Sequence, residues 1–562
     1  MIIFIKRLLT FWSIRPEWAT GMKTQKQLSG NDNLILAVDL GTSGCKSAVC
    51  TLDGRILSWA YREVELMILP GHGAEQRPED WWTALLETSR TALNASGVDR
   101  SKVRGICCST QGEVTVPVDE QGQELMNAVL WMDMRGAEHI QNHAGGPVAG
   151  YSPRKLWKWI RLTGGAPSLS GKDPAAHMLL IKNEFPEVYE RTYKFLNALD
   201  YLNMKLTGKF VATPDSILTS WVTDNRDSNR VRYDSSLLTL SGIDPKKFPE
   251  IVRCTDIIGG LLPEVASALK LPSGTPVIGG AIDVSAAAIG SGAVVDGEAH
   301  LYIGTSSWIA AHVPNKKTDI ISSMASVPCA IPGKYLMTAM QTTAGANLSF
   351  LKDRILYHQD ELLREEHVSD VYKILDRIAA RTPAGSRGLL YMPWLYGERC
   401  PVDDLSLRGG MVNLSLEHSR EDIIRAFLEG VALNTRWMLK PVEKFLKKNL
   451  SSITIVGGGA TSDVWCQIFA DTLGIPVRQP EATVQSNARG SAWIAGIGLG
   501  LLKFSDIPEL IRIKAEYQPD QKNKKAMDEM FARFMQLHDA LGPLYKSWNR
   551  EKTLIVHGKK TA

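Results

Sequence analysis

The sequence predicts an α/β protein of two domains, and three observations lead to this prediction. The chain has 562 residues, whereas a single hydrophobic core rarely grows beyond about 250–300 residues. Short apolar runs typical of strands alternate with segments typical of helices, as in α/β folds. The tripeptide Gly-Thr-Ser stands between two strand-like runs at Gly41 and again at Gly304, which indicates an internal duplication.

The first strand-like pair covers residues 34–38 and 47–52, with a glycine-rich turn between them. Small residues and free backbone N–H groups allow phosphate oxygens to approach the chain closely. Asp39 can hold a magnesium ion through water, and Lys46 can reach a phosphate as a point charge. We therefore predict a phosphate-binding turn formed by Gly41, Thr42, Ser43 and Gly44. An ordinary glycine-rich hairpin without a ligand is the alternative.

A helix is predicted to begin at Pro78. Proline at the first helical position loses no hydrogen bond, and Glu79 and Asp80 then lie at the positive end of the helix dipole. Strand-like runs follow at residues 103–108 and 114–118. This alternation extends the α/β pattern along the first half of the chain.

The second half repeats the arrangement. Residues 299–303 and 308–313 are predicted as strands around Gly304 and Thr305, a second candidate phosphate turn. A run at 452–456 then leads through three glycines into a predicted helix at 464–473. Such a turn lets a phosphate or a flat ring approach the backbone, although a turn without a ligand is equally compatible. The chain has neither Gly-x-Gly-x-x-Gly nor a Walker Gly-Lys-Ser, which disfavours a dinucleotide fold and a P-loop enzyme.

Asp283 is the only charged residue in the apolar and small-residue run from Val277 to Val295. A carboxylate placed among apolar residues is costly without a partner, and such surroundings often tune a catalytic base. The alternative is that Asp283 caps the N-terminus of a helix. The sequence leaves both options open.

Composition excludes several classes of function. A net charge of +4, with scattered Lys and Arg residues, gives no basic stripe for nucleic acid. The eight cysteines form no Cys-x-x-Cys pair, which argues against a zinc site and for buried, reduced cysteines in the cytoplasm. No apolar run reaches the roughly 20 residues of a membrane span. Residues 1–32 are expected to form a poorly ordered extension and residues 549–562 a tail.

Eight motifs taken together resemble those of the FGGY carbohydrate kinases, and within them the xylulokinase branch. They occur in the family's order between about residues 34 and 500, and they begin at Asp39, Glu75, Leu130, Gly279, Ile303, Gly397, Phe427 and Val456. The resemblance implies two ribonuclease-H-like domains of the actin/hexokinase ATPase type, with a catalytic cleft between them. It places an N-terminal domain at residues 33–278, with the sugar site and the first phosphate loop. A C-terminal domain follows at 279–548, with the catalytic Asp, the second phosphate loop and the adenosine site.

The resemblance also implies roles for individual residues. Asp283 corresponds to the catalytic base, and Asp39 to the aspartate linked to Mg²⁺. The ATP-binding positions are Gly41, Thr42, Ser43, Lys46, Gly304, Thr305, Gly345, Gly458, Gly459 and Asp463. The positions implied for the sugar are Thr110, Gln111, Trp131, Asp133 and Arg135.

Departures from the family pattern fall in the sugar half. Gln111 and Val284 stand where xylulokinases carry His and Asn, and His177-Met-Leu-Leu180 replaces Lys-Leu-x-Trp. Such changes can alter substrate choice strongly. We expect an enzyme that transfers the γ-phosphoryl group of MgATP to a terminal hydroxyl group of a ketose or polyol, with D-xylulose as first candidate.

Three alternatives remain from the sequence. One is a kinase for another pentulose, such as ribulose, or for a polyol; another is a sugar-sensing protein that has lost catalysis. A nucleotide-dependent chaperone or filament protein of the same fold is disfavoured, because such proteins lack Asp283 and the Trp-x-Asp-x-Arg segment. The expected partner is a small sugar, with neither nucleic acid nor membrane, and a homodimer stays open.

Overall fold

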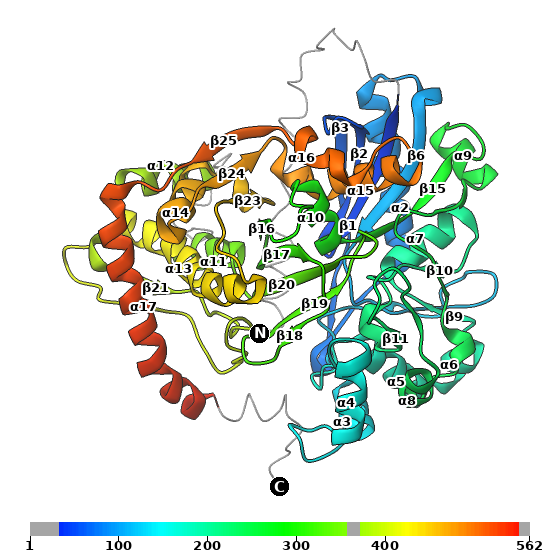
Figure 1. The fold of residues 1–562 in the computed structure, drawn as a ribbon, viewed down its shortest axis with the longest axis horizontal. Coiled ribbons are helices and arrows are strands. Elements are labelled where there is room, and N and C mark those ends of the chain that lie inside the picture. Colours follow the sequence, from blue (N-terminus) through cyan, green and yellow to red (C-terminus); the bar gives the residue numbers. More distant parts are fainter. Residues whose placement is uncertain (1–32, 357–370, 550–562) are drawn as a thin grey trace, which may run out of the picture.

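The computed structural model describes residues 33–356 and 371–549. The extension expected at residues 1–32 lies outside this range, as does the tail beyond Asn549. In Figure 1 two sheets lie side by side, the first mostly blue and the second green to orange, each with helices packed against it. The α/β prediction is confirmed.

The first sheet has six strands in the order β14-β15-β6-β1-β2-β3. Its central strands are continuous apolar runs because helices cover both faces: α2 and α7 pack on one side and α15 on the other. Helix α2 begins at Pro78 with Glu79 and Asp80 in its first turn, as predicted. The bounds are β1 Leu34–Gly41, β2 Gly44–Thr51, β3 Ile56–Glu63, β6 Val103–Thr110, β14 Ile257–Gly260, β15 Pro276–Ile282, α2 Pro78–Ser96, α7 Ala198–Thr207 and α15 Ser486–Gly498.

The second sheet has eight strands in the order β18-β19-β20-β17-β16-β23-β24-β25. Helices α12, α13 and α14 pack over it, and the long helix α17 runs along the outer edge of this half (Figure 1). The bounds are β16 Ala299–Ile303, β17 Ser307–Val313, β18 Thr318–Asp319, β19 Met324–Pro328, β20 Tyr335–Gln341, β23 Ile453–Val456, β24 Val477–Pro480, β25 Ile513–Tyr517, α12 Val371–Arg381, α13 Arg420–Leu446, α14 Asp463–Leu473 and α17 Gln521–Trp548.

The two sheets share one topology. The order β3-β2-β1-β6-β15-β14 recurs as β20-β17-β16-β23-β24-β25. In each, an antiparallel hairpin pairs with two parallel strands, and a final antiparallel strand closes the edge. This agreement of order and direction supports the internal duplication that the repeated Gly-Thr-Ser indicates.

Helices α10 (Asp283–Gly290) and α15 cross between the sheets (Figure 1). Their backbones touch at Gly290 and Gly490, where a Cβ on Gly490 would overlap the carbonyl oxygen of Ala286. The apolar cluster around this crossing takes side chains from both sheets, among them Ile35 and Trp308. The boundary expected between residues 278 and 279 falls inside β15, which belongs to the first sheet up to Ile282.

A second bridge joins the domains away from the helix crossing. Lys316, just before β18, donates to the carbonyl oxygens of Ile160 (3.3 Å) and Arg161 (2.6 Å) at the end of α4 (Pro153–Leu162). Both carbonyls lie in the last turn of this helix, where that of Ile160 also accepts from the backbone N–H groups of Thr163 and Gly164. Thr318 donates to the carbonyl of Gly164 beside them. The two domains are therefore tied here as well as at the helix crossing.

Smaller elements surround the two sheets. In the first half they are β4 Met67–Leu69, β5 Gly73–Gln76, β7 Val116–Val118, β8 Ala128–Val129, α3 Ala137–Ala144, α4 Pro153–Leu162, α5 Pro174–Glu184, α6 Pro186–Arg191, β9 Lys194–Leu196, β10 Val211–Ala212, β11 Thr223–Asp224, β12 Arg232–Tyr233, α8 Ser235–Ser241, β13 Glu250–Ile251 and α9 Pro263–Leu269. In the second half they are α11 Gly345–Phe350, β21 Leu390–Met392, β22 Gly410–Val412 and α16 Ile507–Leu510.

All eight cysteines are free and buried, as predicted for reduced cysteines. Within residues 33–356 and 371–549, no helix combines the length and the apolar character needed to cross a membrane.

Candidate active site

Three parallel strands of the first sheet, β1, β6 and β15, end at the same edge. Asp39 on β1 pairs with Ser109 on β6, and Ile282, the last residue of β15, pairs with Thr110. Asp283 follows directly at the start of α10. The carboxyl ends of neighbouring parallel strands are where α/β proteins bind ligands. The strand order thus brings Asp39, Gln111 and Asp283 to one edge.

Asp39 is buried and accepts three hydrogen bonds. Its donors are Lys46 Nζ at 3.1 Å, Ser109 Oγ at 3.0 Å and Asn487 Nδ2 at 3.1 Å. Burial opposes the charge of Lys46, but the adjacent Asp39 carboxylate raises the pKa of Lys46 above its ordinary value. The sequence indicated Asp39 and Lys46 separately, but neither their ion pair nor Asn487, which comes from α15 at the other end of the chain.

Asp283 is the first residue of α10, and Ile282 occupies the N-cap position. The helix-capping alternative is therefore not the observed arrangement, although Asp283 Oδ1 accepts from the backbone N–H of Val284 at 2.7 Å. Burial, reinforced by the negative charge of Asp39, raises the pKa of Asp283 to about 7. A carboxyl group with such a pKa can both hold and release a proton near neutrality.

The second turn lies in a cluster of backbone segments. The N–H groups of Ala344 and Gly345 donate to the carbonyl oxygens of Thr305 and Gly304, both at 2.9 Å. Gly457 and Gly459 lie so close to Ile303 that a Cβ at either position would clash with it. Four predicted ATP-binding positions, Gly304, Thr305, Gly345 and Gly459, are thus brought together with Gly458 beside them.

Tyr302 is a residue that the sequence did not single out. It stacks on Trp308 with ring centroids 4.0 Å apart, on the stem of the second turn. Burial raises the pKa of Tyr302 to about 12, and the charges of Lys46, Asp39 and Asp283 all act on it. Tyr302 therefore marks where the second turn approaches the carboxylates of the first sheet.

Asp463 is exposed and bonds to the edge strands of the second sheet. It begins α14, and its Oδ1 accepts from Lys514 Nζ at 2.7 Å and Gln479 Nε2 at 3.1 Å. Both partners belong to the strands at the far edge of the second sheet. Its contact with a nucleotide stays a prediction.

The first turn connects to the predicted sugar residues through side chains. Thr42 Oγ1 donates to Gln111 Oε1 at 2.8 Å and accepts from Trp131 Nε1 at 3.0 Å. Gln76 accepts from Gln111 Nε2 at 3.0 Å and donates to the Thr42 carbonyl at 2.8 Å. Thr110 is buried, with its hydroxyl group on the Gln111 carbonyl. Ser43, beside Thr42, accepts from Tyr61 Oη through its carbonyl oxygen at 2.9 Å.

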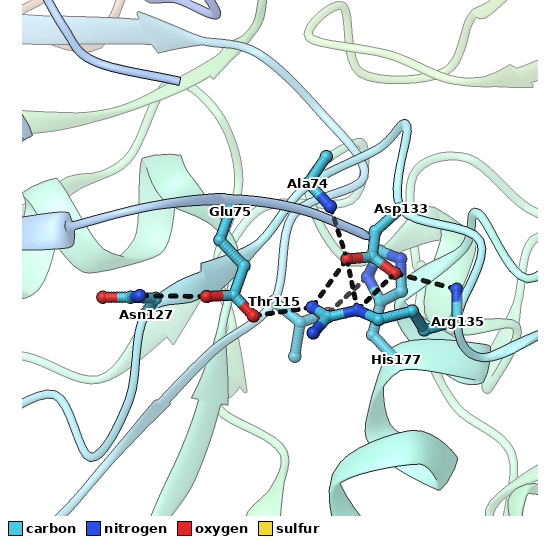
Figure 2. A network of polar contacts seen from close by, with 7 residues as sticks. All are labelled: Ala74, Glu75, Thr115, Asn127, Asp133, Arg135 and His177. Atoms are coloured by element: carbon cyan, nitrogen blue, oxygen red, sulfur yellow. Dashed lines mark hydrogen bonds and ion pairs between the residues drawn. The ribbon is translucent and has the colours of Figure 1, made fainter. Parts of the chain in front are cut away.

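Asp133 and Arg135 form a closed ion-pair network with Glu75 (Figure 2). The Asp133 carboxylate accepts from the backbone N–H of Ala74 at 2.8 Å and from that of Arg135 at 2.9 Å. The guanidinium group of Arg135 reaches Glu75 Oε1 at 2.6 Å. These polar atoms hold the loop that carries Trp131. Contact of Asp133 and Arg135 with a sugar stays a prediction.

His177 lies behind this network (Figure 2). It is fully buried, and Thr115 Oγ1 lies 3.2 Å from its Nδ1. Burial lowers the pKa of His177 to about 4, so this ring is neutral at physiological pH.

Metal binding depends on few protein atoms. No group of three or more His, Cys, Asp or Glu side chains suited to a metal occurs in the described ranges. Mg²⁺ that accompanies nucleotides needs only one or two carboxylates, since phosphates and water complete its octahedron. Asp39, at the end of β1 beside the first turn, fits such a hydrated ion.

Comparison with known proteins agrees with this geometry. Residues 34–290 match the model of the FGGY family of carbohydrate kinases, N-terminal domain, and residues 299–499 match that of its C-terminal domain. The chain is 26% identical to the xylulose kinase of Bacillus subtilis over 90% of its length and 96% of the relative. It is 25% identical to the gluconokinase of the same organism, covering 93% and 99%.

The crystal structure of xylulose kinase from Lactobacillus acidophilus is similar, with a TM-score of 0.78 at 24% identity. The similarity covers 92% of this chain and all of that one. At this identity the likeness establishes the two-domain fold.

Proposed function

Because the chain belongs to the FGGY family of carbohydrate kinases, we propose that it transfers the γ-phosphoryl group of MgATP to a terminal hydroxyl group of a ketose or polyol. Family membership makes it an ATP-dependent sugar kinase with an actin/hexokinase-like fold. The acceptor and the residue roles are the proposal. D-xylulose is the first candidate, and another pentulose such as ribulose, or a polyol, is the alternative.

One observation carries the proposal: Asp283 stands at the end of β15 with its pKa raised to about 7 by burial and by the nearby Asp39. A general base works best when its pKa lies near the working pH. The carboxylate also lies at the junction of the two domains, on the helix that packs against α15. A base at this position can serve an acceptor held by the first domain.

In the proposed step, the acceptor hydroxyl oxygen forms a bond to the γ-phosphorus while the bond from that phosphorus to the bridging oxygen of ADP breaks. The hydroxyl proton passes to the Asp283 carboxylate. Lys46 and the N–H groups of the two turns bind phosphate oxygens. Mg²⁺, held by Asp39 through water, would neutralise phosphate charge when bound. Atoms balance, with ADP and the phosphorylated acceptor as products.

Water is a competing nucleophile for the γ-phosphoryl group. The bridge from Lys316 to α4 and the shared apolar cluster around α10 and α15 hold the domains against each other. An ordered junction of this kind favours transfer to a bound hydroxyl group over hydrolysis.

Sequence identity does not indicate which acceptor is used, because relatives named xylulose kinase and gluconokinase are 26% and 25% identical to this chain. Two side chains on the acceptor side already have partners inside the protein. Gln111 uses its amide inside the protein, and Val284 packs partly against the apolar cluster between the sheets.

The test is a coupled assay of ADP release over pentuloses, hexuloses, pentitols, glycerol and aldonates. We expect at least one ketose or polyol to stimulate ADP release well above the rate with ATP alone, and D-xylulose to be among the best. Calorimetric sugar binding without stimulated release would instead support the sugar-sensing alternative. Absence of both binding and release for every acceptor would contradict the proposal.

A further inference from the structure

The end of strand β15, which leads into Asp283, departs from regular sheet pairing. Strand β14 pairs with β15 only from Pro276 to Ile278, and the pairing with β6 is irregular between Ile278 and Ala281. Gly280 lies within this irregularity and has a φ of 76°, a left-handed value that glycine adopts readily. In the described part of the chain, β15 beyond Ile278 therefore has a paired strand on the β6 side only.

Groups from other segments take the place of the missing strand. The N–H groups of Gly279 and Gly280 donate to backbone carbonyl groups of the loop between β13 and β14, both at 2.9 Å. The N–H of Ile282, the residue before Asp283, donates instead to a side chain, Asp215 Oδ2, at 3.1 Å. A backbone N–H left without a partner inside a protein is costly. Asp215 thus supplies the acceptor that a neighbouring strand would otherwise provide.

Asp215 is a buried carboxylate held by neutral donors. It lies between β10 and β11 and is 3% exposed. Its Oδ1 accepts from Thr213 Oγ1 at 2.7 Å and from Cys254 Sγ at 3.5 Å. Burying a carboxylate is costly, and neutral donors offset this cost only in part. A carboxylate offers two acceptor oxygens where asparagine offers one, so Asp215 can hold several donors at once.

The donors to Asp215 lie on both sides of Asp283. Ile282 precedes Asp283, and the buried Ser285 follows it by two residues in the first turn of α10. Burial raises the pKa of Asp215, while its hydrogen bonds, among them one from the Ser285 hydroxyl group, lower it. One carboxylate from a distant segment is therefore bonded to the strand end and to the helix start between which Asp283 stands.

We propose that Asp215 is a positioning residue for the base, which fixes the direction of the Asp283 carboxylate by holding Ile282 and Ser285. This inference rests on the proposed function, because Asp215 acts through Asp283. A general base must lie within hydrogen-bond distance of the proton that it accepts, and a displacement of about 1 Å can lower the rate about 100-fold. Asp215 should therefore affect the chemical step and not the binding of either substrate.

The variant Asp215→Ala removes the acceptor for Ile282 and Ser285 and tests this proposal. With the best acceptor of the ADP-release screen, we expect kcat to fall by about 10- to 100-fold. The KM values for the acceptor and for MgATP should stay within about two-fold of the wild type. Asp215→Asn keeps one acceptor oxygen and should lose less activity than Asp215→Ala. Single-turnover phosphoryl transfer measures the chemical step directly.

A double-mutant cycle with Asp283→Asn distinguishes positioning of the base from a general structural role. Asp215→Ala should not lower the residual rate of Asp283→Asn further, because the group that it positions no longer acts as a base. Equal losses in the two backgrounds would overturn the proposal. Thr213→Val keeps the shape of its side chain but removes one donor to Asp215. It should lower kcat about three-fold in the wild-type background only, and it extends the test if Asp215→Ala does not fold.

Asp471→Ala is the matched control for loss of a buried carboxylate. Asp471 lies in the second domain and accepts from the backbone N–H of Asp520 at 2.8 Å. Its loss should lower the melting temperature and leave kcat within about two-fold of the wild type.

The outcomes separate this inference from the proposed function. A wild type that phosphorylates an acceptor and depends on Asp283, but keeps its full kcat in Asp215→Ala, overturns the positioning role alone. A raised KM with unchanged kcat in Asp215→Ala overturns it as well. A wild type that phosphorylates no acceptor overturns the proposed function and this inference together.

Discussion

The two glycine-rich turns stand at equivalent places in two sheets of the same topology, yet their surroundings differ. The turn at Gly41 connects through side chains, from Thr42 to Gln111 and Trp131. The turn at Gly304 connects through backbone, to Gly345 and to the glycines after β23. One unit of the duplication thus presents side chains, which we propose serve the acceptor. The other presents main-chain groups, which we propose serve the nucleotide.

The strongest test of this division lies at the junction of the halves, at Asp283. Asp283→Asn should lower phosphorylation by about two to four orders of magnitude, because an amide cannot accept the hydroxyl proton. MgATP affinity should stay nearly unchanged, since the proposed phosphate contacts are Lys46 and the N–H groups of the two turns. ADP release and calorimetric ATP binding measure the two effects. Near-normal turnover would remove Asp283 from the mechanism.

The junction can also be broken sterically. Gly490→Ala places a Cβ onto the carbonyl oxygen of Ala286 where α15 crosses α10, and should lower the free energy of unfolding by about 3 kcal/mol. Gly542→Ala in α17 is the control, because no atom lies within 4 Å of the new Cβ. It should stabilise the helix by about 0.5–1 kcal/mol. Urea unfolding that ranks the two variants equally would contradict the tight crossing.

Two buried histidines make the stability of the second sheet sensitive to acid. His300 on β16 and His312 on β17 are buried, and burial lowers their pKa values to about 3 and about 4. Both are neutral in the folded state, whereas the unfolded chain takes up protons below about pH 6.5. Stability contributed by neutral His300 is therefore lost as pH falls from about 6.5 toward 3.

Between pH 7.5 and 5, we expect the wild type to lose about 2 kcal/mol more stability than His300→Leu. Urea unfolding of both proteins at the two pH values isolates the histidine from the buried carboxylates, which titrate in both. Parallel losses in the two proteins would show that His300 can be protonated in the folded state.

A matched pair of variants separates the two turns most directly. Thr42→Val removes the hydroxyl group between Gln111 and Trp131, and should raise the acceptor KM by about ten-fold, the equivalent of one hydrogen bond. Thr305→Val should raise the KM for MgATP, by a similar or smaller factor. Steady-state kinetics with each substrate varied gives all four values. If both variants weakened the same substrate, the turns would not have divided roles.

Much of the fold and part of the site could be predicted from local pattern. The strand pair around Gly41, the helix at Pro78 and the strand before Gly457 appear where the sequence placed them, because each depends on neighbouring residues. The glycines of the second turn were also recognisable, since a close backbone approach excludes any Cβ. Asp283 stood out as a lone charge, but the sequence could not decide whether it is a base or a helix cap.

The sequence by itself determined the two-domain α/β class, the glycine turns and the candidate base. Only the tertiary structure decided which partners the buried polar groups have. Asn487 donates to Asp39, and Glu398 accepts from the N–H of Arg399. Arg135 pairs with Glu75, and Asp133 accepts from the backbone N–H of Ala74. The physical reason is range. Backbone conformation follows from residues a few positions apart, whereas the partner of a buried polar group is set by which distant segments the packed sheets bring within hydrogen-bond distance.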